Sequence, residues 1–380
     1  MAVSPALFKA DGQDEKRKPK TYHTLQKPAP ALSLAEQLDQ QERAKYVKGR
    51  FYSLTIWNAA NCGAGKKIGS GTYADVFEAH LVSDSSRLVA IKKIKVGPEV
   101  QEWGITHDSL REIKFLQELS HPNIIRLHSV FSTKNQNLNL VLEHLPQGDL
   151  EKLIKDEQVY YGPSDIKAWM SMFCRAVWFC HENFVLHRDI KPNNLLIAAN
   201  GEIKLADFGL ARSFADPGNL MTHKVITLWY RPPELFYKAS YYSGAVDIWS
   251  VGCVFAELIM RRPFLVPASE SDIAMIGVIC KNVGTPTDEN WPGVSRLPAY
   301  VPVAKEEATP EKTKDEWLAS FPAVGEVGVD LLMKMFALDP RKRLTARQIL
   351  QHGYWTAEPR PSNLEDLPKK GGACSPWAKS

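Results

Sequence analysis

One short polar run, VLHRDIKPNNLL at residues 185–196, restricts what this chain can be more than any other feature. It places an aspartate, a lysine and two asparagines between apolar residues that are typical of short strands. Taken singly, Asp189 could form a turn and Asn194 could cap a helix. The run alone is therefore compatible with a solvated turn or with a catalytic loop.

A second acidic position, Asp207, follows in LADFGLAR, directly before a Phe-Gly turn. Asn194 and Asp207 would supply two oxygen ligands of the kind that Mg²⁺ takes together with nucleotide phosphates. Asp189 would then accept the proton of a substrate hydroxyl, and Lys191 would neutralise charge on the moving phosphoryl group. The two runs together indicate phosphoryl transfer.

Upstream, KKIGSGTYADVF places Gly69 and Gly71 at G-x-G spacing, with Ala74 where a third glycine often stands. Glycines let backbone NH groups approach phosphate oxygens, although a plain hairpin turn would carry the same residues. Lys92 ends the β-type run LVAIK, and a lysine directed inward needs an anion to hold its charge. Glu112, in the helical pattern DSLREIKFLQEL, could provide it; a snorkelling strand lysine is the alternative.

The composition changes along the chain and predicts two folded lobes between polar ends. Residues 1–45 are poor in aromatics and are expected to form a flexible arm. Residues 46–145 combine β-type runs with one helical pattern, and residues 146–357 are mainly helical, so we expect an α+β protein. Residues 358–380 return to Pro, Gly and Lys and are expected to be a tail.

Charge and cysteine spacing argue against several functions. The net charge is only +4 and no apolar stretch is long enough to span a membrane, so we expect neither direct nucleic-acid binding nor membrane insertion. The six cysteines show no C-x-x-C spacing, so metal binding through them and disulfides are not expected. Reduced thiols in the cytosol or nucleus are the simplest interpretation.

In this order and spacing, the glycine loop, strand lysine, HRDIKPNN and DFG runs resemble the eukaryotic protein kinase family over roughly residues 66–355. The resemblance implies the two-lobed protein kinase fold, with ATP and Mg²⁺ as cofactors, and Asp-x-Lys is similar to the serine/threonine class. It implies catalytic roles for Asp189, Lys191, Lys92 and Glu112, and metal binding by Asn194 and Asp207. It assigns nucleotide binding to Ile68, Gly69, Gly71, Val76, Ala90, Lys92, Glu143, Leu145, Asp149 and Leu196.

The same resemblance implies three structural placements. Glu234 in RPPE would form an ion pair with Arg343 in LDPRKRLTA. His187 would pack in the core beneath Asp207, and Leu142 would lie beside the adenine as the gatekeeper.

Finer features resemble the cyclin-dependent kinases. SLREI stands where a cyclin positions a helix in these enzymes, so the resemblance implies that the Lys92–Glu112 pair forms only on partner binding. Thr222 stands at the family's activating phosphosite, with Arg188 available to bind the phosphate; an unmodified threonine is the alternative. VITLWYR is similar to the segment that selects proline after the phosphorylated Ser or Thr.

Several stretches, including LQELSHPNII, IKPNNLL and TPTDENWPGVSRLPAYV, are similar to the subfamily that activates other cyclin-dependent kinases and serves in TFIIH. The resemblance implies an H-type cyclin, a RING-domain assembly factor and the TFIIH core as partners. It implies the heptad-repeat tail of RNA polymerase II as a substrate, a second phosphosite at Ser213, and a nuclear location. The basic run KRKPK at residues 16–20 is either an import signal or a solvated segment.

Three features, at four positions, differ from that subfamily. Leu228 stands where the TFIIH kinase usually has arginine, and Thr72 and Tyr73 are a cell-cycle feature whose phosphorylation would clash with the nucleotide. Leu142 is smaller than the usual phenylalanine. A cell-cycle cyclin-dependent kinase is thus the first alternative, and a catalytically inactive scaffold is the second.

Residues 50–65 interrupt the first expected strand, because Cys62 stands where an aromatic is expected. Joining Gly49 to Lys66 would restore that strand, with Tyr46 in the aromatic position. The stretch is either a retained intron or a genuine surface loop, since such insertions cost little. Peptide mass spectrometry decides: a peptide crossing from Gly49 directly to Lys66 supports the intron, and one containing LTIWNAANCGAG excludes it.

Overall fold

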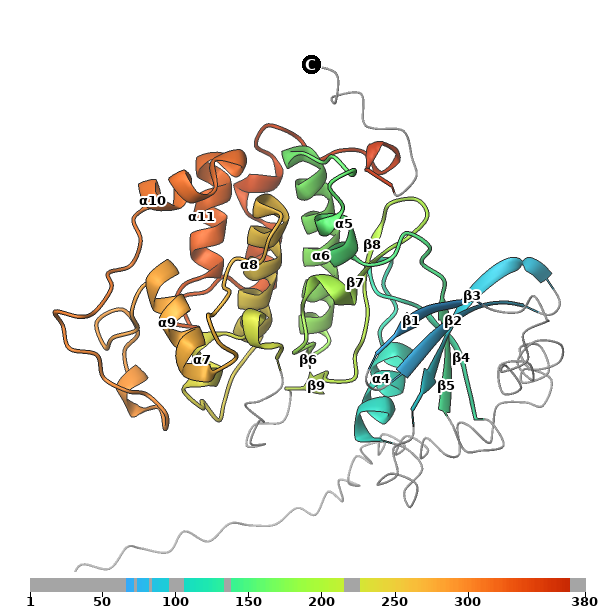
Figure 1. The fold of residues 1–380 in the computed structure, drawn as a ribbon, viewed down its shortest axis with the longest axis horizontal. Helices are drawn as coiled ribbons and strands as arrows, with labels where there is room; N and C mark the ends of the chain where they lie inside the picture. The colour runs from blue at the N-terminus through green and yellow to red at the C-terminus, as the bar shows by residue number, and fades with distance from the viewer. Residues whose placement is uncertain are drawn as a thin grey trace, which may run out of the picture.

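The computed structural model describes residues 66–71, 74–81, 84–95, 106–132, 138–214 and 226–369. Figure 1 shows the predicted α+β arrangement, with a small lobe built on a sheet and a larger helical lobe. The predicted arm, the 50–65 stretch, the end of the tail, and Thr72, Tyr73 and Thr222 lie outside the described residues. Within the described ranges, no helix has the length and apolar character needed to cross a membrane.

The small lobe is a five-stranded antiparallel sheet in the order β1-β2-β3-β5-β4. Its strands are β1 (Lys67–Ser70), β2 (Ala74–Leu81), β3 (Asp84–Ile94), β4 (Leu127–Ser132) and β5 (Leu138–Glu143). Directly opposed residues share a face of a sheet, so the pairs Val76–Lys92, Lys92–Leu140 and Ala90–Leu142 place five side chains on one face. On the other face, side chains of the same strands form a separate apolar cluster of Ala79, Val89, Ile91, Phe131 and Val141.

Helix α4 (His107–Glu118) is the one helix that the small lobe shows among the described residues. Its N-terminus is capped by Thr106, whose hydroxyl accepts from the Ser109 amide at 3.2 Å. Ile113, Phe115 and Leu116 are buried against the rest of the core. Glu112 lies on the same buried side, at 3% exposure, so its charge requires a partner inside the protein.

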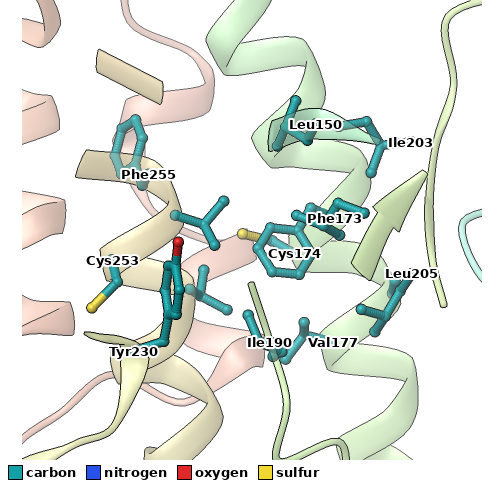
Figure 2. Close-up of a cluster of buried hydrophobic side chains, with 14 of the residues drawn as sticks. Leu150, Phe173, Cys174, Val177, Ile190, Ile203, Leu205, Tyr230, Cys253 and Phe255 are labelled. Carbon is teal, nitrogen blue, oxygen red and sulfur yellow. The ribbon is translucent and has the colours of Figure 1, made fainter. Parts of the chain in front are cut away.

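The large lobe is organised around α6 (Pro163–Glu182) and α8 (Ala245–Met260). Figure 2 shows Phe173, Cys174 and Val177 of α6 in the apolar layer between these helices and the strand β8. The other helices are α5 (Leu150–Lys155), α7 (Pro233–Phe236), α9 (Asp272–Asn282), α10 (Lys314–Ser320), α11 (Gly325–Met335) and α12 (Ala346–Leu350). Two short antiparallel pairs join β6 (Val185–Leu186) to β9 (Arg212–Ser213) and β7 (Leu195–Ile197) to β8 (Ile203–Leu205).

The predicted Glu234–Arg343 ion pair is present and fully buried. Two guanidinium nitrogens of Arg343 lie 2.6 and 2.8 Å from the two carboxylate oxygens of Glu234. The same guanidinium donates to the carbonyls of Ala337 and Ala245 and lies over the Trp249 ring. This bidentate pair connects α7 to the segment before α12.

Residues 358–369, predicted as the start of the tail, lie against the large lobe. The buried Lys167 of α6 donates to the carbonyls of Ala357 and Pro359 at 2.9 and 2.7 Å. Ser362 donates to Asp165 at 2.7 Å, and Leu367 is 3% exposed. The proline-rich composition of this stretch concealed these contacts, because each one joins residues almost 200 positions apart.

Candidate active site

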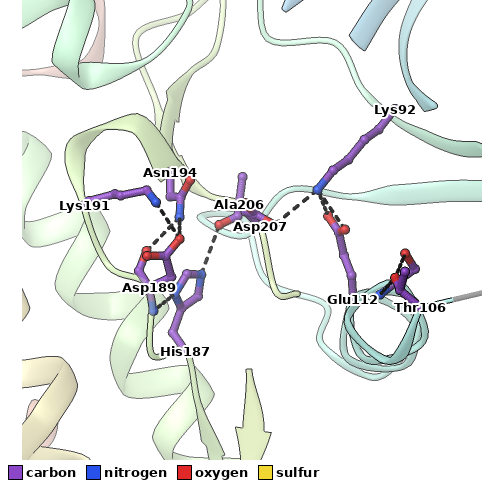
Figure 3. A network of polar contacts seen from close by, with 10 residues as sticks. Lys92, Thr106, Glu112, His187, Asp189, Lys191, Asn194, Ala206 and Asp207 are labelled. Atoms are coloured by element: carbon purple, nitrogen blue, oxygen red, sulfur yellow. Dashed lines mark hydrogen bonds and ion pairs between the residues drawn. The ribbon is translucent and has the colours of Figure 1, made fainter. Parts of the chain in front are cut away.

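Lys92, Glu112 and Asp207 meet where the two lobes face each other (Figure 3). The ammonium of Lys92 lies 2.8 Å from both carboxylate oxygens of Glu112 and 3.2 Å from Oδ1 of Asp207. The sheet register directs Lys92 inward, as predicted, and α4 presents Glu112 to it. The dependence of this pair on a partner stays a prediction.

Burial disfavours the charge on Lys92, but Glu112 and Asp207 outweigh it and raise the pKa of the lysine. Burial likewise opposes ionisation of Asp207, yet the Lys92 ammonium holds the pKa of that carboxyl below its usual value. Lys92 is therefore a cation and Asp207 an anion at neutral pH.

The carboxylate of Asp189 receives three donors. Its Oδ2 accepts from Lys191 Nζ at 2.7 Å and from Asn194 Nδ2 at 2.9 Å, and its Oδ1 accepts from the Thr227 hydroxyl at 2.9 Å. Asn194 also donates to the Asp189 carbonyl at 2.7 Å, which closes the loop on itself. The orientation of the Asp189 carboxylate is fixed before any substrate binds.

The residue before Asp207 joins the two halves of the site. The Ala206 amide donates to the Asn194 carbonyl at 2.9 Å, and the Ala206 carbonyl lies 3.0 Å from His187 Nε2. His187 is 1% exposed and packs edge-on against Phe208, so its predicted place in the core is confirmed. The polar run and the DFG run therefore form one rigid unit.

Two functional residues were not predicted. Asp247 in α8 is fully buried, and its carboxylate accepts from the amides of His187 and Arg188 at 3.0 and 2.9 Å. Thr227 bridges Lys191 and Asp189 through its hydroxyl. The available signal was one aspartate in the apolar run AVDIWSVG, where a buried charge requires partners.

Arg188 and Asp207 both have positive φ, 65° in each case. Such a backbone is costly for residues other than glycine and is commonly found at functional sites. Arg188 donates from Nε to the Leu210 carbonyl at 2.8 Å and from its terminal nitrogen to the Tyr242 hydroxyl at 3.1 Å. It thus lies against the beginning of the activation segment, where Ser213 is exposed in β9.

Several of the residues predicted to bind the nucleotide lie on or next to the inner face of the small-lobe sheet. Val76, Ala90 and Leu142 share the inner face of the sheet with Lys92, and Gly69 pairs with Val76. Ile68 is 39% exposed on β1, Leu145 follows β5, and Leu196 of β7 pairs with Asp149 across a single bridge. An added Cβ on Gly69 would lie 3.5 Å from Val76, and Gly71 closes the turn by donating to the Ala74 carbonyl.

Two residues predicted to bind the nucleotide, Glu143 and Asp149, use their carboxylates in contacts within the protein. Glu143 forms an ion pair with Lys204 of β8 at 2.9 Å. Asp149 caps α5 by accepting from the Lys152 amide at 2.9 Å, and it also pairs with the Lys152 ammonium. A nucleotide would therefore meet the backbone of Glu143 rather than its side chain.

Asn194 and Asp207 fit the donor set of a magnesium ion. The amide nitrogen of Asn194 is directed to Asp189, so the amide oxygen faces the other way. No cluster of three or more His, Cys, Asp or Glu suited to a metal occurs in the described ranges. Two oxygen donors would suffice for Mg²⁺, which takes few protein ligands and completes its shell with phosphates and water.

Comparisons with known proteins agree with this geometry. Residues 63–355 match the family described as protein kinase domain. The chain is 48% identical over 307 residues to the serine/threonine-protein kinase crk1 of Schizosaccharomyces pombe, covering 81% of this chain and 88% of that protein. It is 44% identical over 303 residues to cyclin-dependent kinase 7 of Xenopus laevis, covering 80% and 83%.

A solved structure of the CAK complex from Chaetomium thermophilum, bound to ATP-gamma-S, contains a similar chain. The TM-score is 0.79 at 56% identity, over 91% of this chain and 100% of that one. The chain therefore belongs to the protein kinase family. Within it, the chain is an ATP-dependent serine/threonine kinase of the cyclin-dependent type, similar to cyclin-dependent kinase 7 and to the kinase of the CAK complex, as the sequence predicted.

Proposed function

We propose that this kinase acts within TFIIH, where it phosphorylates Ser-Pro sites of the RNA polymerase II repeat and the activation segments of other cyclin-dependent kinases. The observation that carries phosphoryl transfer is the connected site itself, in which hydrogen bonds link Lys92 to Asp207, and Asn194 to Asp189 and to the residue before Asp207. Similarity to the kinase of a CAK complex supports the choice of partners and substrates. The setting would be the nucleus.

In the proposed reaction, Asp189 orients the substrate hydroxyl and takes its proton as the oxygen attacks the γ-phosphorus of ATP. The bond from that phosphorus to the β,γ-bridging oxygen breaks, and ADP leaves. Lys191, 2.7 Å from Asp189, is placed to neutralise the transferred group, and Lys92 would hold the other phosphates. When bound at Asn194 and Asp207, Mg²⁺ would offset phosphate charge.

Activation would act on two places in the described site. An H-type cyclin, with a RING-domain assembly factor, would hold α4 so that Glu112 stays on Lys92. Phosphate on Thr222 would bind Arg188 and order the activation segment, and Ser213 would be a second phosphosite. Arg188 is suited to this because Asp247 and Leu210 already fix its backbone and side chain.

The segment after the activation loop would select proline. Arg231 donates twice to the Ile226 carbonyl, at 3.1 and 2.9 Å, which fixes the turn that carries Thr227 and Leu228. The Ile226 carbonyl is occupied by Arg231 and the backbone beside Asp189 is fixed. A substrate proline would suit this place, because proline has no backbone NH group to donate. Leu228 at this place is the specific observation that favours the second candidate, a cell-cycle kinase acting with a mitotic-type cyclin.

The test is phosphate transfer by the purified chain, with and without an H-type cyclin and its assembly factor. The substrates are a polymerase heptad-repeat peptide and an inactive cell-cycle kinase. We expect partner-dependent transfer to both, lost in Asp189→Asn. Activity only with a mitotic-type cyclin and histone-like substrates would favour the second candidate, and no transfer with any partner would favour an inactive scaffold.

A further inference from the structure

Asn193, in the middle of the catalytic run, has its own partner on another element. It lies in the short 3-10 turn η2 (Pro192–Asn194), between Lys191 and the proposed metal ligand Asn194. Its amide nitrogen donates to Oε2 of Glu151, in the first turn of α5. None of the roles proposed above uses Glu151 or Asn193.

Helix α5 is attached to the catalytic run at two points. Asp149, the N-cap of α5, pairs with Leu196 just after η2. Glu151 reaches Asn193 inside η2, and its other oxygen accepts from Lys155 Nζ at 2.8 Å. The Lys155 contact orients the Glu151 carboxylate, so that Oε2 is presented to the loop.

A simpler explanation of Glu151 is that it only forms a surface i,i+4 pair with Lys155. Such pairs contribute little, and the Lys155 side chain is 65% exposed. The Asn193 contact also lies at the surface, but it joins two elements, α5 and the catalytic run, whereas the Lys155 contact joins two positions of one helix. Charge-assisted hydrogen bonds of this type are stronger and shorter than neutral ones.

The path from Glu151 to the reacting groups is short, with one hydrogen bond to Asn193, one peptide link to Asn194 and hydrogen bonds from Asn194 to Asp189. Asn193 is followed directly by Asn194, which donates to both the carbonyl and the carboxylate of Asp189. A displacement of η2 therefore moves the proposed metal ligand and loosens the proposed base together. Small displacements of reacting groups are costly in rate.

We propose that Glu151 is a positioning residue of the kinase reaction, which holds the catalytic run from α5 through the side chain of Asn193. The inference rests on the roles proposed above for Asp189 and Asn194, and not on the identity of the cyclin or the substrate. Glu151 touches neither substrate nor nucleotide in this account. Its effect should therefore be found in kcat and in the demand for Mg²⁺.

The first test compares Glu151→Ala and Glu151→Gln in the partner-activated kinase, with a generic Ser-Pro peptide. We expect Glu151→Ala to lower kcat about tenfold and to raise the Mg²⁺ concentration needed for half-maximal rate, with the peptide KM changed less than about twofold. Glu151→Gln keeps an acceptor oxygen but loses the charge, so it should recover part of the rate. The matched control is Glu157→Ala, which removes the same charge from an exposed position just beyond α5.

The second test is the cycle of Glu151→Ala, Asn193→Ala and the double variant, with the unfolding midpoint of each measured in parallel. Residues that act through one contact give losses that do not multiply, so the double variant should be no worse than about twofold below either single one. Multiplying losses, a change confined to the peptide KM, or an unchanged Glu151→Ala would overturn the inference. Asp189→Asn, assayed beside them, separates the two proposals, since its retained activity would instead refute the roles given to the catalytic run.

Discussion

Two ion pairs of this kinase differ in how far solvent reaches them. Glu234–Arg343 lies inside the large lobe, with side-chain exposures of 2% and 0%. Lys92–Glu112 lies between the sheet and α4, with exposures of 16% and 4%, and Lys92 also reaches Asp207, whose side chain is 46% exposed. The Glu234–Arg343 pair is closed to solvent, whereas the group around Lys92 is partly exposed through Asp207.

The number of partners explains the difference. Arg343 makes a bidentate bond to Glu234 and donates to three carbonyls, those of Ala337, Leu338 and Ala245. This planar fork has one arrangement that satisfies it. Lys92 divides a single ammonium between two carboxylates, one from helix α4 of the small lobe and one from a loop of the large lobe. The first pair stabilises the fold, and the second can report the position of α4 to the site.

The largest effect on stability is expected when the Glu234–Arg343 pair is broken. Arg343→Met leaves the Glu234 carboxylate buried without a cation, and should lower the free energy of unfolding by about 3 to 5 kcal/mol. Denaturant unfolding measures this loss, while kcat per folded molecule should be nearly unchanged. The double variant Glu234→Leu with Arg343→Met removes both charges and should be more stable than the single one. Equal stability of the two would contradict this account of the pair.

Breaking the Lys92–Glu112 pair should instead lower the rate of phosphate transfer. Lys92→Met removes the ammonium that meets Glu112 and Asp207, and we expect phosphate transfer to fall about 100- to 1,000-fold. The loss of stability should be smaller than for Arg343→Met, because one of the two released carboxylates, that of Asp207, is 46% exposed and keeps its contact with water. Lys92→Arg keeps the positive charge but not the geometry of the ammonium. If it fails to restore phosphate transfer, the position of the charge is required as well as its presence. A fall in stability equal to that of Arg343→Met would remove the distinction between the pairs.

Glu257 sharpens the comparison, because it is a buried carboxylate whose hydrogen-bond donor is neutral. It accepts from the Tyr230 hydroxyl at 2.8 Å, and burial, with Glu151 nearby, raises its pKa from the ordinary 4.5 to about 7. The folded state then holds a proton that the unfolded state has lost, so stability falls as pH rises from about 4.5 to 7. Glu257→Gln should remove this fall and gain about 1 to 3 kcal/mol at pH 8. Unfolding at pH 5.5 and 8 measures it, and a gain of the same size at both would contradict the assignment.

The smallest effect is expected at an exposed cluster. Asp75 lies 2.9 Å from the Lys67 ammonium and 3.1 Å from that of Lys95, on the solvent side of the glycine loop. Screened pairs of this kind contribute less than about 1 kcal/mol, so Asp75→Asn should leave stability and the ATP KM almost unchanged. An ATP KM raised more than about fivefold would show that exposed charges also position the site.

The sequence predicted the parts of the site whose positions are fixed by short spacings. Asp189, Lys191 and Asn194 lie within six residues, and a single strand or turn determines how they meet. The α+β fold followed from the change in hydrophobic periodicity, and the pairing of Lys92 with Glu112 followed from one strand and one helix. These are local inferences, combined with a recognisable order of motifs.

Contacts between distant segments could not be predicted in the same way. Asp247 bonds to the His187 amide across 60 positions, and Thr227 reaches Asp189 across 38. Their side chains are ordinary in their own segments, and only the packing of α8 and η3 (Leu228–Tyr230) on the catalytic run gives them a role. The docked segment 358–369 was missed for the same reason, since proline and lysine conceal its anchors at Lys167 and Asp165.

All the proposed roles depend on phosphoryl transfer at the run 185–196, with Asp189 taking the proton. Its most direct test is single-turnover phosphate transfer from labelled ATP by the partner-activated Asp189→Asn variant, with its unfolding midpoint measured beside that of the wild type. The account predicts a loss of about 1,000-fold or more with an unchanged midpoint, because asparagine keeps the shape and loses the base. Transfer within about tenfold of the wild type, from an equally stable variant, would contradict it.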